Sequence, residues 1–341
     1  MPSLIQENVS LKAFNSFGFD VTARYFTELT SMDQIESVLG FARNNRLALL
    51  VIGGGSNLVL TDDIDALVLV NRLCEREIIA EQDGVVRVQA GAGENWHDFV
   101  RWTLEQGLSG LENLSLIPGT VGAAPMQNIG AYGVELKDVM LSLEAYDIET
   151  GEIKVFSCDQ CGFGYRDSVF KNRYPGRYLV LSVLFSLQAE YQPVLHYGGI
   201  ADELAAAGIE TPTALQVSDL ICEVRCRKLP QPEAIGNAGS FFKNPVISNA
   251  EAEQLKQRFS GLVSFSDKPG FTKLAAGWLI DQLGWKGRRQ GDAGVYDKQA
   301  LVLVNHGTAT GSDILELAGA IQADVYSHYG VMLEIEPRSY P

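Results

Sequence analysis

Apolar residues recur along the chain with two different periods, which predicts a mixture of helices and strands. Early in the chain, apolar residues at helical spacing over 35–42 predict a helix. Ser31 and Gln34 precede this run at the spacing of a capping box, in which each side chain bonds a free amide of the first turn. Residues 24–60 are therefore expected to form a β-α-β unit, in which the continuous apolar run 48–52 is the buried strand after the helix. This strand stops at a glycine-rich loop, and the run 67–70 predicts the next strand.

The same two periods continue through the rest of the chain. Helices are predicted at about 95–106, 215–227, 249–259, 273–283 and 312–328, and strands at 139–146, 178–186 and 300–304. The stretch 110–133 is rich in Gly, Pro, Ala and Asn and predicts no regular element, while Pro230 and Pro232 mark a boundary. With no internal repeat, the pattern predicts an α+β class in about three lobes.

Composition narrows the range of functions. The 341 residues suffice for two or three domains, and 46% hydrophobic with 20% charged residues is an ordinary globular composition. A net charge of −15 repels phosphate backbones and anionic membrane surfaces, so no nucleic-acid or membrane partner is expected. No apolar run approaches the ~20 residues of a membrane span. The first residues lack the basic start and apolar middle of a signal peptide, which predicts a cytoplasmic protein.

The cysteines and the basic clusters give weaker indications of a metal site or an anion-binding pocket. The pairs Cys158/Cys161 and Cys222/Cys226 have spacings that could hold zinc, but the second pair lies inside a predicted helix. Reduced structural thiols and no metal site are therefore expected. Basic clusters at 225–228 and 286–289 predict either a solvated face or a pocket for an anionic substrate, and the sequence leaves both open.

The loop Gly53-Gly54-Gly55-Ser56-Asn57 follows a predicted strand. Successive exposed amides in such a loop can form a nest for a pyrophosphate, but a tight turn would also use these glycines. The Gly-x-Gly-x-x-Gly pattern fails at Leu58, and no Walker A sequence is present. A nicotinamide dinucleotide held by a Rossmann domain is therefore disfavoured.

Small residues dominate the segment 117–133, which has few apolar anchors. Such a segment is expected to pack against a flat, wide cofactor. The alternative is a buried irregular loop, which would leave backbone groups unpaired that a ligand could satisfy.

The segment 236–245 places a hydroxyl, a cation and an amide close together at Ser240, Lys243 and Asn244. A nucleophilic serine would need a neighbouring base, whereas a proton donor would not. The four histidines lie in no triad-like context and are expected to be structural or exposed: His97, His196, His306 and His328. Ser240 is therefore predicted to give a proton.

Near the C-terminus, apolar and polar residues alternate. On a strand, the apolar residues Val331, Leu333 and Ile335 would be buried. The polar residues Glu334, Glu336 and Arg338 would then project from the opposite face. A solvated edge strand is the alternative.

Together these segments resemble the UDP-N-acetylenolpyruvoylglucosamine reductases (UDP-N-acetylmuramate dehydrogenases) over nearly the whole chain. The most specific blocks are 117–133, 163–168 (Phe-Gly-Tyr-Arg-Asp-Ser) and 236–245, in the order of the family. Tyr197, within 193–198, resembles the substrate-closing tyrosine of the type I branch.

The resemblance implies a fold, an activity and a cofactor. The fold is a two-lobed FAD-binding domain of the vanillyl-alcohol-oxidase type plus an α+β substrate-binding domain. The implied division is residues 1–75 for the first FAD-binding lobe, 76–229 for the second with the insertion around Tyr197, 230–330 for the substrate-binding domain and 331–341 for a strand returning to the active site. FAD is expected to bind noncovalently, with NADPH as co-substrate, UDP-N-acetylglucosamine enolpyruvate as substrate, and a monomeric enzyme.

Site residues follow from the resemblance position by position. The implied catalytic residues are Arg166, Ser240 and Glu336. The implied cofactor contacts are Gly53, Gly54, Gly55, Ser56, Asn57, Leu58, Pro118, Gly119, Gly122, Ala123, Ala124, Gln127, Asn128, Ile129 and Gly130. The implied substrate contacts are Tyr132, Tyr165, Tyr197, Lys228, Asn244, Lys286, Gln299 and Arg338.

Two departures from the family pattern bear on these assignments. Ser16 stands where the family usually has Thr. The C-terminal motif, usually Leu-Glu-Pro-Glu-Val-Arg, here reads Leu-Glu-Ile-Glu-Pro-Arg over 333–338, which leaves Glu334 open beside Glu336 as the catalytic carboxylate.

The implied reaction has two stages. NADPH reduces the flavin and leaves, and the enolpyruvyl sugar then receives a hydride at C3 and a proton at C2. Arg166 and Glu336 would stabilise the charge that develops at C2, and Ser240 would donate the proton. Two other functions remain open: another flavin oxidoreductase of the same fold, and a non-catalytic UDP-sugar binding protein.

Overall fold

The computed structural model describes residues 4–341, which form two compact units. Unit 1 contains the described residues up to Val9 together with Ala23–Gly55 and Ile64–Arg227. Unit 2 contains Ser10–Thr22, Ser56–Asp63 and Lys228–Pro341. The four-part division expected from the sequence, of which residues 1–3 lie outside the described chain, remains a prediction.

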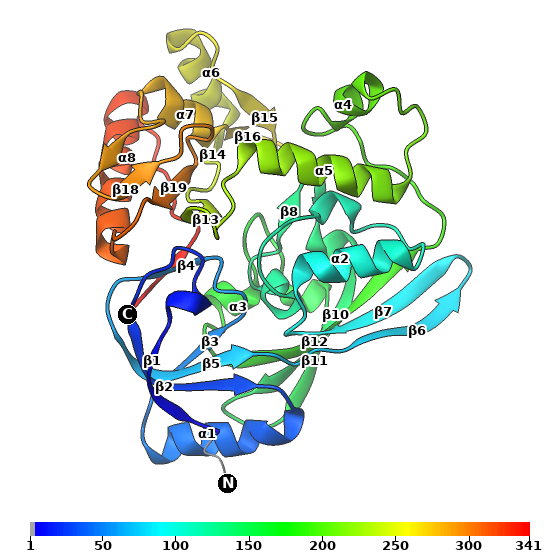
Figure 1. Ribbon diagram of the computed structural model, residues 1–341. Helices are drawn as coiled ribbons and strands as arrows, with labels where there is room; N and C mark the ends of the chain where they lie inside the picture. The colour runs from blue at the N-terminus through cyan, green and yellow to red at the C-terminus, as the bar shows by residue number, and fades with distance from the viewer. Residues whose placement is uncertain (1–3) are drawn as a thin grey trace. The chain divides into compact units, whose positions relative to one another are not determined.

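The first sheet of unit 1 is a β-α-β arrangement. Its strands lie in the order β1-β2-β5-β3. The elements are β1 (Gln6–Ser10), β2 (Thr22–Leu29), α1 (Ile35–Asn44), β3 (Leu49–Ile52) and β5 (Ile64–Asn71). β5 pairs in parallel with both β2 and β3, an arrangement that requires a crossover, and α1 supplies it between β2 and β3. Figure 1 shows α1 lying along this sheet, and buried side chains from both form one core cluster.

The second sheet of unit 1 is antiparallel, in the order β11-β10-β12-β7-β6. Its strands are β6 (Arg76–Gln82), β7 (Val85–Gly91), β10 (Met140–Asp147), β11 (Ile153–Ser157) and β12 (Tyr178–Gln188). The register of β12 against β10 shifts by one residue between Val180 and Ser182. This bulge reverses the alternation, so that Val180 and Val183 both point into the larger core cluster.

A helix and several short elements cover this sheet. α2 (Trp96–Glu105) begins at Asn95, whose side chain accepts a hydrogen bond from the amide of Asp98. Its Trp96 and Phe99 are fully buried against Phe185 of β12. The short elements are η3 (Glu112–Leu114), η4 (Val121–Met126), β8 (Gly130–Ala131), β9 (Val134–Glu135), η5 (Leu136–Asp138), η6 (Asp159–Cys161) and α3 (Val169–Asn172).

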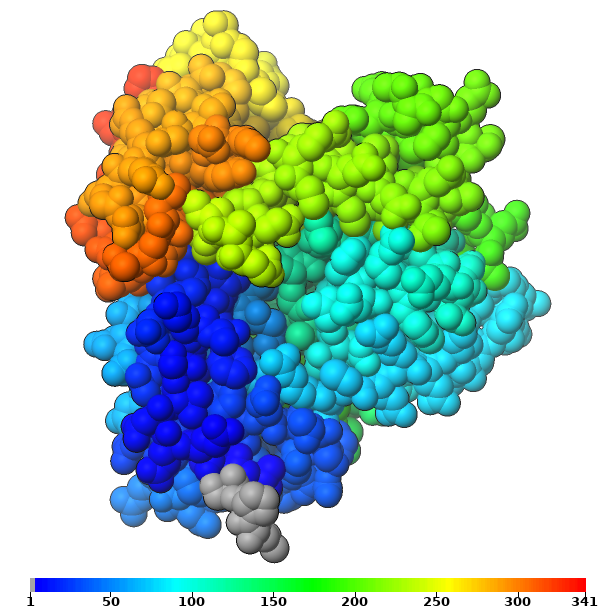
Figure 2. Space-filling model, in the orientation of Figure 1, coloured from blue at the N-terminus to red at the C-terminus, as the bar shows by residue number. Residues whose placement is uncertain are grey.

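Two helices complete unit 1. α4 (Ile200–Ala206) and α5 (Ala214–Lys228) form a small apolar cluster of their own around Ile200, Leu204, Val217 and Ile221. The segment that carries α4 lies on the surface, where Figure 2 shows its green atoms.

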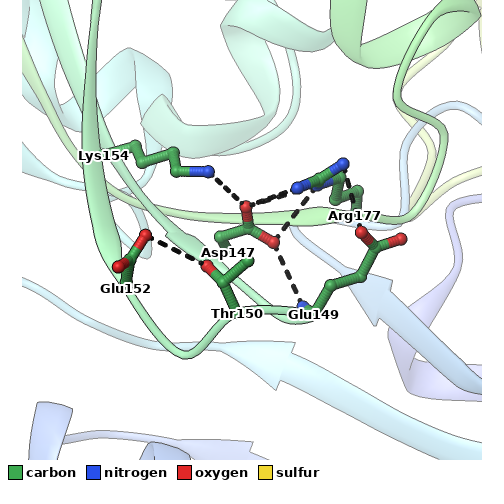
Figure 3. A network of polar contacts seen from close by, with 6 residues as sticks. All are labelled: Asp147, Glu149, Thr150, Glu152, Lys154 and Arg177. Atoms are coloured by element: carbon green, nitrogen blue, oxygen red, sulfur yellow. Dashed lines mark hydrogen bonds and ion pairs between the residues drawn. The ribbon is translucent and has the colours of Figure 1, made fainter.

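A buried carboxylate ties together three strands of the second sheet. The side chain of Asp147, at the end of β10, is fully buried and accepts hydrogen bonds from Lys154 of β11 (2.6 Å) and from Arg177 next to β12 (2.9 Å). Figure 3 shows the two cations pointing at this carboxylate. The hydrogen bonds from Arg177 hold the pKa of Asp147 far below its usual range, so the carboxylate stays ionised.

Unit 2 is built on two small antiparallel sheets. One has the order β13-β19-β18-β17 and the other β14-β16-β15. The strands are β13 (Gly236–Ser240), β14 (Val246–Ser248), β15 (Ser264–Ser266), β16 (Phe271–Leu274), β17 (Arg289–Gln290), β18 (Ala293–Val295) and β19 (Val302–Asn305). The helices are η1 (Lys12–Phe14), α6 (Asn249–Arg258), α7 (Ala276–Gln282) and α8 (Gly311–Tyr329). A separate pair, β4 (Leu58–Leu60) with β20 (Arg338–Tyr340), joins the C-terminus in parallel to the segment after the glycine loop.

Most predicted elements are confirmed, and the errors are local. The capping box predicted at Ser31 and Gln34 is wrong, because the side chain of Ser31 makes no capping hydrogen bond. A short 3-10 helix, η2 (Met32–Gln34), precedes α1, and the side chain of Gln34 accepts a hydrogen bond from the amide of Thr30. The helix predicted at 273–283 begins only at Ala276, because the residues before it pair in β16. No helix among residues 4–341 is long and apolar enough to cross a membrane.

Candidate active site

The glycine loop of unit 1 packs directly against the small-residue segment. A Cβ on Gly53 would lie 2.6 Å from Oγ1 of Thr120, and a Cβ on Gly54 would lie 2.6 Å from Cα of Gly119. Any larger residue at these two positions would therefore push the segments apart. The predicted cofactor segments at 53–55 and 118–123 are thus brought together.

Four consecutive amides of the small-residue segment are bonded to carbonyls of the chain. The amides of Val121 and Gly122 bond to carbonyls of Glu94 and Ala92, and those of Ala123 and Ala124 bond to the carbonyl of Thr120. The expectation that these backbone groups need a ligand is therefore wrong for these four amides.

One polar atom in this region does need a partner. The hydroxyl of Thr120 is buried and has no hydrogen-bond partner among the described residues. An orphaned buried hydroxyl costs stability unless a ligand bonds to it. Together with the closely packed glycines, it fits a bound flavin nucleotide. Thr120 lies within the segment 117–133 that is predicted to contact the cofactor, but it is not among the predicted contact residues.

The far end of the segment is held by protein contacts. The amide nitrogen of Asn128 donates to Glu135 (3.0 Å) and to the carbonyl of Gly164 (3.1 Å), and its oxygen accepts the amide of Lys137 (3.0 Å). Asn128 is fully buried, so its side chain fixes the loop that leads to Gly130.

Arg166 lies in a strained turn beside this loop. Its φ of +54° is in the left-handed region, which non-glycine residues rarely adopt and which often marks functional sites. Its guanidinium donates to the carbonyl of Gly130 at 2.8 Å and lies over the ring of Tyr165. The structure therefore brings three predicted site residues together.

A second arginine of unit 1, Arg225, belongs to the basic cluster 225–228 but is not among the predicted site residues. The Nε of Arg225 on α5 is buried and has no hydrogen-bond partner in the described chain. The groups that act electrostatically on it are Tyr132, Arg166 and two cysteines, with no carboxylate among them, and burial lowers its pKa. The exposed Arg227 pairs with Glu203 instead. The two arginines of the basic cluster 225–228 therefore differ: Arg227 is exposed and paired with a carboxylate, whereas the buried Nε of Arg225 has no partner among the described residues.

In unit 2, two segments far apart in sequence pair beside Ser240. Ser240 ends β13 and is exposed, while Phe241 and Phe242 behind it are buried. The carbonyl of Phe241 accepts the amide of Glu336 (2.9 Å), and Phe242 forms a β-bridge with Ile335. The hydroxyl and the C-terminal carboxylates thus lie on adjacent stretches of backbone.

The two carboxylates in question have different surroundings. Glu336 is 9% exposed, whereas Glu334 is exposed and forms an ion pair with Lys243. The prediction that both project from one strand face is wrong. The regular strand is only β20, because Glu336 and Pro337 are both buried and interrupt the alternation.

The residues after the glycine loop adjoin the same C-terminal segment. The side-chain amide of Asn57 donates to the carbonyl of Glu336 at 3.5 Å, and the carbonyl of Asn57 accepts the amide of Arg338 at 3.1 Å. Leu58 is the strand partner of Arg338. Predicted cofactor and catalytic positions therefore meet within unit 2.

Three predicted substrate contacts of unit 2 already have partners in the chain. Asn244 accepts the amide of Ala276 (2.9 Å), Lys286 pairs with Asp281 (3.0 Å), and Gln299 accepts the amide of Leu301 (3.3 Å). Lys228 is exposed. The described residues contain no cluster of three His, Cys, Asp or Glu that could hold a metal.

Comparisons with known proteins cover both units. Residues 231–340 match the family described as UDP-N-acetylenolpyruvoylglucosamine reductase, C-terminal domain, and residues 23–157 match the family described as FAD binding domain. The chain is similar to proteins named UDP-N-acetylenolpyruvoylglucosamine reductase from Pseudomonas putida, with 54% identity over 335 residues and 98% of both chains covered. It is likewise similar to one from Pseudomonas fluorescens, with 56% identity over 338 residues, 98% of this chain and 99% of that one.

A solved structure agrees in fold. The UDP-N-acetylenolpyruvylglucosamine reductase of Thermus caldophilus has a TM-score of 0.70 to this chain at 24% identity, covering 99% of this chain and 100% of that one. The predicted fold class, an FAD-binding domain of the vanillyl-alcohol-oxidase type followed by a second α+β domain, is confirmed.

Proposed function

The chain belongs to the UDP-N-acetylenolpyruvoylglucosamine reductases, and from this membership we propose which of its residues hold the cofactor, hold the substrate and carry the reaction. The enzyme is an FAD-dependent oxidoreductase that uses NADPH to reduce UDP-N-acetylglucosamine enolpyruvate in peptidoglycan precursor synthesis. FAD supplies hydride transfer when bound. The two other functions left open by the sequence are not supported by this membership.

The flavin is held by the paired loops. Gly53 and Gly54 allow the close approach of 118–123, and the Thr120 hydroxyl is available to a ligand atom. The predicted contacts at Ser56, Asn57 and Leu58 continue the same loop. Asn128 acts indirectly, because its side chain is committed to protein partners.

The reduction is carried by three side chains. As a hydride reaches C3 of the enolpyruvyl group, negative charge develops at C2 and spreads into the carboxylate. Arg166 stabilises that charge, and Glu336 assists it through a hydrogen bond. Ser240 then donates its proton to C2. The observation that supports the last two roles is the backbone pairing of Phe241 with Glu336, since it brings the chain at an exposed serine next to the chain at a buried glutamate.

The sugar nucleotide is held by the polar residues named from the family. Lys286 exchanges its ion pair with Asp281 for the anionic substrate, which its exposed position permits. Tyr197 closes over the substrate, as expected of the type I branch. The buried Nε of Arg225, which has no hydrogen-bond partner among the described residues, supports a further anion contact.

We further propose that the enzyme is a cytoplasmic monomer. The acidic surface disfavours anionic membranes. Sedimentation velocity of the full chain at micromolar concentration checks the monomer, since a concentration-dependent shift to a faster species would contradict it.

An anaerobic visible spectrum tests the function itself. The purified protein should show flavin absorbance that NADPH bleaches and UDP-N-acetylglucosamine enolpyruvate restores. Bleaching without restoration by the sugar nucleotide would contradict the assigned substrate, and a colourless active protein would contradict the cofactor.

A further inference from the structure

The loop that carries Tyr197 is docked on a turn of the small-residue segment. Gly133 has a φ of +84°, and a Cβ there would lie 3.2 Å from the Cβ of Tyr197. Gly198 has a φ of +71°, and a Cβ there would lie 2.9 Å from the ring of Tyr132. Both glycines therefore lie in close contact with the opposite segment, and a side chain at either would separate the two.

One buried side chain bonds to both segments. Asn113, in η3, is fully buried, and its Nδ2 donates to the carbonyl of Tyr132 and to the carbonyl of Val194, each at 2.8 Å. Because both partners are carbonyl oxygens, the nitrogen must be the atom that faces them. The two N–H groups of one amide thus bridge the turn and the loop three residues before Tyr197.

The side-chain oxygen of Asn113 indicates why this position is an asparagine. Oδ1 of Asn113 is buried and has no hydrogen-bond partner among the described residues. An unpaired buried acceptor lowers stability, so packing alone would favour an apolar side chain. The residue is therefore best explained by its two donors, which hold the turn and the loop at a fixed separation.

We propose that Asn113 is a positioning residue for substrate binding, which latches the Tyr197 loop to the Tyr132 turn and so sets where Tyr197 meets the sugar nucleotide. This rests on the proposed role of Tyr197. In this role Asn113 acts through Tyr197 and not through a contact of its own with substrate or flavin. Loss of the latch leaves the flavin half-reaction intact and weakens binding of the second substrate.

A double-mutant cycle separates this role from a general structural one. Asn113→Ala should raise KM for UDP-N-acetylglucosamine enolpyruvate about tenfold, the usual scale for losing one or two buried hydrogen bonds. Flavin reduction by NADPH should stay within about twofold of wild type. In a Tyr197→Phe background the same substitution should change KM by less than about twofold, because the residue it positions has already lost its hydroxyl.

The possible outcomes test the proposed role of Asn113 separately from the proposed role of Tyr197. If Tyr197→Phe raises KM and the Asn113→Ala effect adds to it in full, the latch is wrong while the role of Tyr197 stands. If Tyr197→Phe alone leaves KM unchanged, Tyr197 does not contribute to substrate binding, and the proposed role of Asn113 is then wrong as well.

A matched glycine pair tests the same docking without touching Asn113. Gly198 and Gly199 have similar left-handed backbones, with φ of +71° and +76°, but a Cβ on Gly199 meets nothing within 4 Å. Gly198→Ala should therefore raise KM for the sugar nucleotide, while Gly199→Ala, which carries the same backbone strain, should not. Equal changes in KM for Gly198→Ala and Gly199→Ala would overturn the proposal. This comparison can be made even if the Asn113→Ala variant does not fold.

Discussion

Three side chains are proposed to carry the reaction, and each is held differently. Ser240 is exposed at the end of β13, with two buried phenylalanines behind it. Glu336 is largely buried and hydrogen-bonded through its backbone to Phe241. Arg166 sits in a strained left-handed conformation and donates to the carbonyl of Gly130. A hydroxyl open to ligand suits proton donation, and a fixed cation suits charge stabilisation.

The first prediction at this scale concerns Ser240. Ser240→Ala should slow flavin reoxidation by the enolpyruvyl sugar by about 10²–10⁴, the usual contribution of a general acid. Reduction of the flavin by NADPH needs no proton at C2 and should stay near wild type. Ser240→Cys, which keeps an ionisable hydrogen, should retain more activity than the alanine variant. Stopped-flow measurement of the two half-reactions decides: equal slowing of both would make Ser240 structural, and slowing of neither would place the donor elsewhere.

The second prediction compares two neighbouring carboxylates. Glu336→Gln should slow flavin reoxidation by the sugar by about 10²–10³, the range for losing one electrostatic stabiliser of the transition state. Glu334→Gln should cost less than about threefold, because the Glu334 side chain is 68% exposed and the ion pair of an exposed carboxylate contributes little. The same stopped-flow traces measure both variants. The reverse ranking would move the catalytic role to Glu334.

At the scale of elements, buried polar groups join pieces of chain that hydrophobic packing alone would leave free to slide. Asp147 joins β10, β11 and the start of β12 through Lys154 and Arg177. The β-bulge at β12 sets which of its residues face the larger core. Such contacts fix register, which alternation by itself specifies only to within two residues.

The Asp147 network has a pH dependence of known sign. The folded-state pKa of Asp147 is depressed, so the stabilisation it provides is present above its unfolded pKa of about 4 and is lost as pH falls below that value. Asp147→Asn should lower the free energy of unfolding by about 2 kcal/mol at pH 7, below the usual range for a broken buried pair because both cations are partly exposed. The difference from wild type should shrink on acidification from pH 4 towards pH 2.

Urea unfolding at several pH values measures this effect. Glu149 is the matched control, because it pairs with the same Arg177 but is 65% exposed. Glu149→Gln should change stability by less than about 0.5 kcal/mol. A difference for Asp147→Asn that stays constant down to pH 2 would contradict the assigned ionisation.

At the scale of the whole molecule, each of the two units is assembled from separated stretches of chain. Unit 2 recruits Ser10–Thr22 and Ser56–Asp63 to the C-terminal third, and β4 pairs there with β20. The glycine loop is continuous with one of these recruited stretches, since Gly55 ends a segment of unit 1 and Ser56 begins one of unit 2. The loop 53–58 therefore spans the point in the chain at which unit 1 passes into unit 2.

The prediction at this scale concerns how the cofactor is attached. Neither 53–55 nor 117–133 contains a histidine or cysteine, so FAD should bind without a covalent bond. Heat or acid denaturation should release it intact into the supernatant, and FAD at about 100 times its Kd should stabilise the fold by about 2.7 kcal/mol. Chromatography of the supernatant and a thermal scan with added FAD measure both. Flavin that remains attached to the denatured chain would contradict the prediction.

The sequence by itself determined most of the longer helices, several of the buried strands and the family. Helical spacing over 35–42 and 312–328 predicts α1 and α8, because their periodicity is a property of adjacent residues. The blocks 117–133 and 236–245 identify the family because long motifs of small and polar residues rarely arise by chance. Short strands such as β13 and β17, with few apolar residues, escaped prediction.

Only the tertiary structure decided how distant residues meet. The pairing of Phe241 with Glu336, the inward position of Arg225 and the two hydrogen bonds of Asn113 depend on contacts between residues far apart along the chain. The same structure separated buried Glu336 from exposed Glu334, which the alternating pattern treated alike. Periodicity reports which residues prefer burial but not what they are buried against, because the partner is selected by the packing of the whole chain.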